Sequence, residues 1–261
     1  MEIIDFHIHP VLDDTNNLCF YKEIYDLSPE NQIKQLRDAG ITHVCGSVIE
    51  MSKDNPNMEV IKRCNRKAVE MKKIWGKFYT PGIHVHPYFV EESINEIEFA
   101  HENGINLIGE LEPYGHRWKD PSDERFDEIL NYAAKYDMVV SIHSADGDDN
   151  TAWEHMIKTH KNITFVAAHP GDRKRMETHV ERMKKFENYN LDLSGTGIFR
   201  FGIISHMINE VGSDRLLFGT DYPITNPLMY VQAIKGEYLK DSDYENIMYN
   251  NARRILGKSI S

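Results

Sequence analysis

The chain has 261 residues, of which 41% are hydrophobic and 27% charged, a composition typical of a globular enzyme that buries a large core. It carries 41 acidic against 30 basic residues, a formal net charge of −11, which argues against non-specific binding to nucleic acid or to an anionic membrane. The sequence contains no apolar run long enough to cross a bilayer.

The cysteines and the opening segment indicate a compartment. Cys19, Cys45 and Cys64 form an odd set without a C-x-x-C pair, which predicts free thiols in a reducing environment. The segment MEIIDFHIHP lacks a basic stretch followed by an apolar one, so we expect no secretory signal. Together these features predict a cytoplasmic protein.

Short apolar runs rich in β-branched residues alternate with longer amphipathic stretches along the chain. The apolar runs predict strands at 2–8, 41–48, 78–85, 105–111, 138–143, 163–168, 189–194 and 215–220. The amphipathic stretches predict helices near 29–39, 57–74, 90–102, 122–135, 150–159, 173–186, 199–210, 226–235 and 242–256.

Eight strands that each precede a helix indicate a parallel sheet, and eight such units favour a closed (β/α)8 TIM barrel over an open sheet. The chain length matches one barrel, and no linker interrupts the pattern, so we expect a single domain over 1–261. Ser28 followed by Pro29 predicts a helix start, and Ser242 with Glu245 predicts a capping box for the last helix.

An H-x-H pair, His7 and His9, ends the first predicted strand. Residues two apart on a strand face the same side, and α/β barrels build their active sites at the C-terminal ends of their strands. The two imidazoles are therefore expected to point together into the mouth of the barrel and to bind one cation. Taken alone, the pair also fits two hydrogen-bonded histidines without a metal.

Three further candidate ligands end later strands: His143 the fifth, His169 the sixth and Asp221 the eighth. Neighbouring parallel strands lie about 4.8 Å apart, so side chains at the ends of the fifth and sixth strands can converge. The eighth strand closes the barrel beside the first, which brings Asp221 toward the H-x-H pair. Each residue alone fits an ordinary core or surface role, and only their joint placement predicts a divalent-metal site.

A carboxylate in LIGELEP completes the candidate set. Glu110 at the end of the fourth strand can bridge two cations about 3.5–4 Å apart. Glu112 has the same parity and lies nearer the rim, so the choice between them stays open, with Glu110 preferred. Either residue also fits a loop carboxylate or a partner of a ligand. The metal number is therefore one or two, with zinc expected and manganese or iron compatible.

The combined motif resembles the amidohydrolase superfamily of metal-dependent (β/α)8 hydrolases. FGTDYP and NNARRILG are similar to the amidohydrolase-related (amidohydrolase 2) branch, which also contains metal-dependent decarboxylases, whereas GIHVHP and IGELEPY are similar to the TatD-like branch, whose strand-four glutamate bridges two metals. The strand-four lysine that other branches carbamylate is absent, and Glu110 would take its place. The residues that carry the resemblance are His7, His9, Glu110, His143, His169 and Asp221.

Candidate substrate-binding residues surround this set. His86 ends the third strand, with His84 deeper, while His116 and Arg117 lie in YGHRW after the fourth strand and Arg200 follows the seventh. The planar guanidinium of arginine suits a carboxylate or a phosphate. We expect these residues to bind an anionic group, although packed histidines and exposed arginines without a ligand are common.

The sequence predicts a hydrolase that uses a metal-activated water on a small anionic ester, lactone or amide. Asp221 would orient the water, accept its proton and pass it to the leaving group. The expected first metal site is His7, His9 and Asp221, and the expected second is His143 and His169, with Glu110 bridging.

Three alternatives remain at this point. A non-oxidative decarboxylase of a small carboxylic acid would use one metal, with His169 as an acid or base and an arginine on the departing carboxylate. A TatD-like phosphodiester or DNA hydrolase is disfavoured by the acidic net charge. A barrel that holds metal only for structure is the third. The expected partner is a small-molecule substrate rather than nucleic acid or a membrane, and a homo-oligomer is compatible with the sequence.

Overall fold

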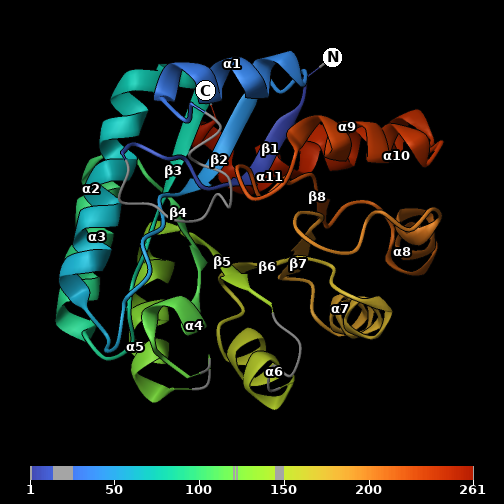
Figure 1. Cartoon of the computed structure of the whole chain (residues 1–261). Helices are drawn as coiled ribbons and strands as arrows, with labels where there is room; N and C mark the ends of the chain where they lie inside the picture. Colours follow the sequence, from blue (N-terminus) through green and yellow to red (C-terminus); the bar gives the residue numbers. More distant parts are fainter. Residues whose placement is uncertain (1, 14–25, 120, 122, 145–149, 261) are drawn as a thin grey trace.

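Eight strands form one parallel sheet in which each strand pairs with the next along the chain. A computed structural model describes residues 2–13, 26–119, 121, 123–144 and 150–260. The helices surround the strands (Figure 1). The strands are β1 (Ile4–Ile8), β2 (His43–Ser47), β3 (Tyr79–Ile83), β4 (Leu107–Leu111), β5 (Val139–His143), β6 (Thr164–Ala168), β7 (Tyr189–Asp192) and β8 (Leu216–Leu217).

Backbone hydrogen bonds join the end of the sheet to its beginning. Phe6 N donates to Phe218 O at 2.8 Å, and His9 N donates to Tyr222 O at 2.7 Å. Ile8 and Tyr222 also form a parallel bridge. The expected (β/α)8 TIM barrel is therefore confirmed, and the segment that follows β8 lies beside β1.

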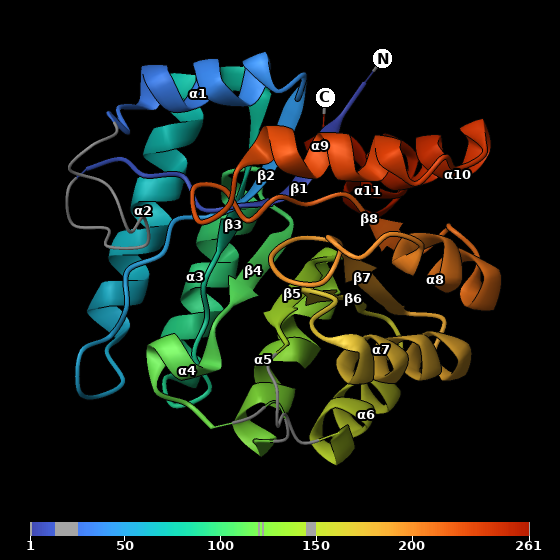
Figure 2. The same cartoon turned by 45° about the vertical axis from the view of Figure 1, so that its right-hand side comes forward.

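The helices lie outside the strands, as the view in Figure 2 also shows. They are α1 (Pro29–Asp38), α2 (Met58–Trp75), α3 (Val90–Glu102), α4 (Pro113–His116), α5 (Glu124–Ala133), α6 (Asn150–Thr159), α7 (Arg173–Lys185), α8 (Ile203–Val211), α9 (Pro227–Gly236), α10 (Asp241–Glu245) and α11 (Asn251–Leu256). Among the described helices, none combines the length and the apolar character that crossing a membrane requires. Cys45 and Cys64 are buried free cysteines, and Cys19 lies outside the described residues.

Two apolar clusters hold the barrel together. The larger lies between the strands and the surrounding helices, with members such as Leu36 of α1 and Ile97 of α3. The smaller joins residues near the beginnings of the strands to α11, and its buried members are Ile4, Phe6, Cys45, Leu107, Val139, Val166, Leu217, Ala252, Leu256 and Ile260. Because α11 packs at the N-terminal end of the barrel, the C-terminal end is left for polar side chains.

The structure differs from the sequence predictions near the C-terminus. β8 is shorter than the expected 215–220, and the expected helix 242–256 is divided by a π-helical segment, η3 (Asn246–Asn250). One contact accounts for both differences, a hydrogen bond from Phe218 N to Ile247 O at 2.9 Å. The Phe218 amide is then not available to extend β8, and the Ile247 carbonyl is not available for a regular helical hydrogen bond.

One predicted helix start and two predicted helix caps also need correction. The expected helix 199–210 begins at Ile203, because Gly202 before it has a left-handed φ of 87°. The capping box is wrong, since α10 begins at Asp241 and Ser242 is inside its first turn. Pro29 opens α1 as expected, but Ser28 makes no side-chain capping bond. The expected start at 122 lies outside the described residues.

Close contact between β1 and β2 requires a glycine at position 46. An added Cβ on Gly46 would lie 2.0 Å from the Ile8 carbonyl oxygen, and φ is 147°. We therefore expect Gly46→Ala to lower the free energy of unfolding by about 2–4 kcal/mol. Gly236→Ala is the matched control, because its Cβ would meet nothing within 4 Å. Equal urea-denaturation midpoints for the two variants would contradict this account.

Candidate metal centre

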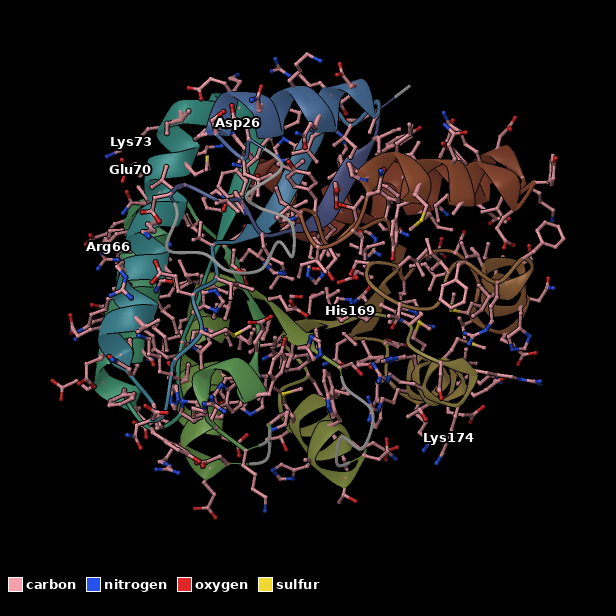
Figure 3. All side chains as sticks on the ribbon, viewed as in Figure 1. Asp26, Arg66, Glu70, Lys73, His169 and Lys174 are labelled. Carbon is pink, nitrogen blue, oxygen red and sulfur yellow. The ribbon has the colours of Figure 1, made fainter. Side chains whose placement is uncertain are left out.

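The six ligands that the sequence predicts all lie at the C-terminal end of the barrel. Five are buried, and His143 is half-buried. Figure 3 shows His169 inside the molecule, whereas Arg66 and Lys73 lie on the outer side of α2. Their positions are His7 within β1, His9 just after it, Glu110 in β4, His143 at the end of β5, His169 just after β6 and Asp221 after β8.

The carboxylate of Glu110 contacts all four histidines. Its Oε2 lies 3.1 Å from His7 Nε2 and 3.2 Å from His9 Nε2. Its Oε1 lies 3.0 Å from His143 Nδ1 and 3.2 Å from His169 Nε2. One carboxylate is thus shared between a histidine pair from the first strand and a pair from the fifth and sixth strands.

Glu112, the other carboxylate of this segment, has a different environment. It is buried, and its Oε1 accepts a hydrogen bond from the Tyr114 hydroxyl at 3.2 Å. Burial raises the pKa of Glu112 to about 8, and the charges of Glu110 and Asp221 act in the same direction. The structure therefore brings Glu110 rather than Glu112 into contact with the histidines.

The spacing of the donor atoms fits divalent cations. His7 Nε2 and His9 Nε2 are 3.0 Å apart, and each lies within 3.2 Å of Glu110 Oε2. Neighbouring ligands at metal–nitrogen distances of about 2.1 Å lie about 3.0–3.4 Å apart for angles between octahedral and tetrahedral. The set His7–His9–Glu110 meets this test, and in a second set, Glu110–His143–His169, the ligand atoms lie within 4.8 Å of one another, with Glu110 Oε1 3.0 Å and 3.2 Å from the two histidines. Asp221 Oδ1 lies 3.4 Å from His9 Nε2, beside the first set.

The electrostatics of the cluster also fit cation binding. Burial disfavours the charged form of His7, yet the carboxylates of Glu110 and Asp192 raise its pKa well above the usual value. Burial likewise opposes ionisation of Glu110, but the charges of His7 and His169 hold its pKa well below the usual range. Protons therefore balance the buried carboxylates here, and a divalent cation would replace them.

Two residues that the sequence reasoning missed support the histidines from β7. Asp192 Oδ2 lies 2.9 Å from His7 Nδ1, and Ser194 Oγ lies 3.0 Å from His7 Nδ1 and 3.0 Å from His169 Nδ1. The predicted strand 189–194 placed Asp192 two residues before its end, whereas in the structure this aspartate ends β7 as His143 ends β5. His9 is fixed differently: its Nδ1 donates to the Ser47 carbonyl oxygen at 3.1 Å, which leaves Nε2 free to bind a metal.

Two of the predicted ligands have left-handed backbone conformations. His169 has a φ of 71° and Asp221 a φ of 64°, values that non-glycine residues seldom adopt. A hydrogen bond from Asp221 N to His7 O, at 2.8 Å, holds the second of these turns against β1. Strained conformations of this kind concentrate at functional sites.

The structure gives two of the four predicted substrate-binding residues hydrogen bonds to the backbone. Both ring nitrogens of His86 are bonded to backbone, Nε2 to His116 O at 2.9 Å and Nδ1 to Tyr88 N at 3.0 Å. The Arg117 guanidinium donates to the carbonyl oxygens of Ser52 and Lys53.

The remaining two predicted substrate-binding residues differ in exposure. His116 is buried with no hydrogen-bond partner for Nε2 among the described residues. Arg200 is exposed over the ring of Phe199. An anion-binding role for His86, His116, Arg117 and Arg200 stays a prediction.

Comparison with known proteins assigns this chain to a protein family. The sequence model of the amidohydrolase family matches residues 4–258, so the chain belongs to that family. A search of curated proteins returned no significant match. The resemblance to the TatD-like branch gains nothing from these comparisons and stays a prediction.

Several solved structures have the same fold. A 2,6-dihydroxybenzoate decarboxylase from Rhizobium is 16% identical with a TM-score of 0.76, covering 98% of each chain. A Staphylococcus aureus protein assigned to the amidohydrolases is 16% identical with a TM-score of 0.75, covering 98% of this chain and 100% of the other. A dihydroxybenzoic acid decarboxylase from Polaromonas, with bound manganese and 2-nitroresorcinol, is 14% identical with a TM-score of 0.72, covering 98% of this chain and 96% of the other. At these identities the likeness shows the fold alone.

The metal-free protein should lose stability as the pH rises. Although burial opposes it, hydrogen bonds to Asp221 and Glu110 raise the pKa of His9 to about 10 in the folded chain, against about 6.5 when unfolded. A histidine whose pKa is raised on folding stabilises the folded state, and this stabilisation is fully present below about pH 6.5 and is lost as the pH approaches 10. We expect the Tm of chelator-treated protein to fall by about 5 °C or more over this window.

The control for this pH dependence is His9→Gln, which should show a smaller fall in Tm between pH 6.5 and 10 because it lacks the titrating imidazole. A Tm of the metal-free wild type that stays constant or rises over the same window would contradict the proposed charge balance.

Separate substitution of Glu110 and Glu112 by glutamine should distinguish their roles. Glu110→Gln removes the charge shared by the four histidines and should weaken zinc binding at least about 100-fold. Glu112→Gln keeps a buried polar group of the same size outside the histidine contacts and should bind zinc within about 3-fold of the wild type. Competition with a chromophoric chelator measures both values. Tighter binding by Glu110→Gln than by Glu112→Gln would reverse the assignment.

Proposed function

We propose that this chain is a metal-dependent hydrolase that acts on a small ester, lactone or amide. The single observation that supports this reaction is the position of Glu110, with one carboxylate oxygen against each histidine pair. A carboxylate placed in this way suits a site of two cations, which is the arrangement that many hydrolases use. Zinc is the first choice for an imidazole-rich set, and manganese or iron is compatible.

Each residue then has a defined task. His7, His9 and Asp221 would hold one cation and His143 and His169 the other, with Glu110 between them. The cations would supply Lewis-acid chemistry, lowering the pKa of a bound water from 15.7 to about 7. Asp221 Oδ1, beside His9 Nε2, would accept the proton of the attacking water and return it to the leaving group.

Non-oxidative decarboxylation of a small carboxylic acid is the second candidate, and the comparisons favour it. Two of the three structures described above are decarboxylases of dihydroxybenzoates, and one of them contains manganese. In this reaction one cation at His7, His9, His143 and Asp221 would bind the substrate, and His169 would act as the acid or base. Glu110 has no evident task in that scheme, which is why we place hydrolysis first.

Metal counting together with a substrate screen separates the two reactions. We expect zinc-saturated protein to hold two cations per chain and to hydrolyse a member of a panel of esters, lactones and amides. A single cation per chain with release of carbon dioxide from dihydroxybenzoates would instead establish decarboxylation. A chain that binds metal and turns over neither panel would contradict both proposals.

Removal of the proton acceptor tests the hydrolytic role of Asp221. Asp221→Asn should lower kcat about 100-fold or more at saturating zinc, because general base catalysis typically raises the rate by a factor of about 10²–10⁴. Asp38→Asn, at an exposed residue paired with Lys34, should leave kcat unchanged. Full turnover in Asp221→Asn would show that another group accepts the proton.

A further inference from the structure

We propose that Asp192 and Ser194 form a positioning pair that fixes the ring orientation and tautomer of His7 and His169 and so links the two metal subsites. This inference deepens the proposed function and rests on its two-cation site. Both residues come from β7 and its C-terminal extension, a strand that contributes none of the six predicted ligands.

Direct contacts connect the pair to one histidine of each subsite. Asp192 Oδ2 and Ser194 Oγ lie 2.9 Å and 3.0 Å from His7 Nδ1, and Ser194 Oγ also lies 3.0 Å from His169 Nδ1. The other ring nitrogen of each histidine, Nε2, faces Glu110 at 3.1 Å and 3.2 Å. The pair therefore contacts the side of each ring that points away from the shared carboxylate.

The hydrogen-bonding capacity of Ser194 specifies the tautomer. A serine hydroxyl offers one donor and two acceptor sites. The donor is used on Asp192 Oδ1, which also accepts from the Ser194 backbone N–H at 2.9 Å. Both acceptor sites then remain for the Nδ1–H groups of His169 and of His7, and the His7 Nδ1–H is shared with Asp192 Oδ2. With Nδ1 protonated in both rings, both Nε2 atoms keep the lone pair that a metal requires.

Local glycines allow this close approach. A Cβ on Gly195 would lie 2.2 Å from His169 Nδ1, and one on Gly219 would lie 2.9 Å from His7 Cβ and 3.1 Å from Ser194 Cβ. The chain thus passes directly against both rings, which leaves little space for them to rotate.

His7, His169 and Asp192 also form a close set, in which one ligand atom from each residue lies within 4.8 Å of the other two. This spacing would allow the set to hold a cation of its own. The hydroxyl of Ser194 stands within 3.0 Å of both Nδ1 atoms in this set, so protons shared with serine and aspartate already satisfy these donors. We therefore assign this set to ligand support and the Nε2 side to metal binding.

Zinc titration of stripped full-length variants tests the pair. Asp192→Asn should weaken zinc binding about 10–100-fold, first at the His7 subsite, and Ser194→Ala should weaken both subsites by a similar factor. The matched controls are Glu96→Gln, a buried carboxylate bonded to Asn65 and Arg66, and Ser93→Ala, a buried serine bonded to the backbone of His86. Both controls should bind zinc within about 2-fold of the wild type.

A spectroscopic readout separates positioning from a merely structural role. Long-range ¹H–¹⁵N NMR of the zinc-loaded wild type should show protonated Nδ1 in His7 and His169, and Ser194→Ala should lose this signature for His169. If Asp192→Asn fails to fold, Ser194→Ala still tests the pair, because it removes only one oxygen. Wild-type affinity at both subsites in Ser194→Ala would overturn the inference.

The two proposals can fail separately. A wild-type chain that saturates with one zinc contradicts the two-cation function, whereas two tightly bound zinc ions in Ser194→Ala contradict only the positioning pair.

Discussion

The sharing of one buried carboxylate among four imidazoles is the interaction on which the rest of the site depends. Glu110 brings negative charge into a region where the surrounding side chains are buried, and an unbalanced charge there would be strongly destabilising. Protonated histidines balance it in the metal-free chain, and a bound divalent cation would replace those protons. The barrel must therefore hold the ends of β1, β4, β5 and β6 within hydrogen-bonding distance of one point.

The barrel meets this demand with supports that lie outside the ligand set. Asp5, below His7, accepts hydrogen bonds from the backbone and side chain of Thr220 at 2.9 Å and 2.6 Å, which joins β1 to the segment that bears Asp221. The Ser47 carbonyl oxygen fixes His9, and the β7 pair fixes His7 and His169. Candidate ligands held by packed strands in this way would need little rearrangement to bind a cation.

Family membership and site geometry bear on different questions. Membership of the amidohydrolase family accounts for the fold and for polar residues at the C-terminal rim, but a fold supports many reactions. The two proposed reactions, hydrolysis and decarboxylation, differ in the number of cations that the site would hold. That number depends on whether Glu110 acts as a bridge, which is a property of this site rather than of the barrel.

The sequence by itself determined the order of strands and helices and the residue types at the strand ends, because period and strand-end position are local properties. His7, His9, His143, His169 and Asp221 were predicted as candidate ligands in this way, and the structure places all five at the same end of the barrel. Only the tertiary structure decided that Glu110 rather than Glu112 faces the histidines, that Arg117 binds loop carbonyls, and that Asp192 and Ser194 support the rings. These contacts join segments up to 187 residues apart, and hydrogen bonds at such separation depend on strand register and turn geometry that no local pattern records.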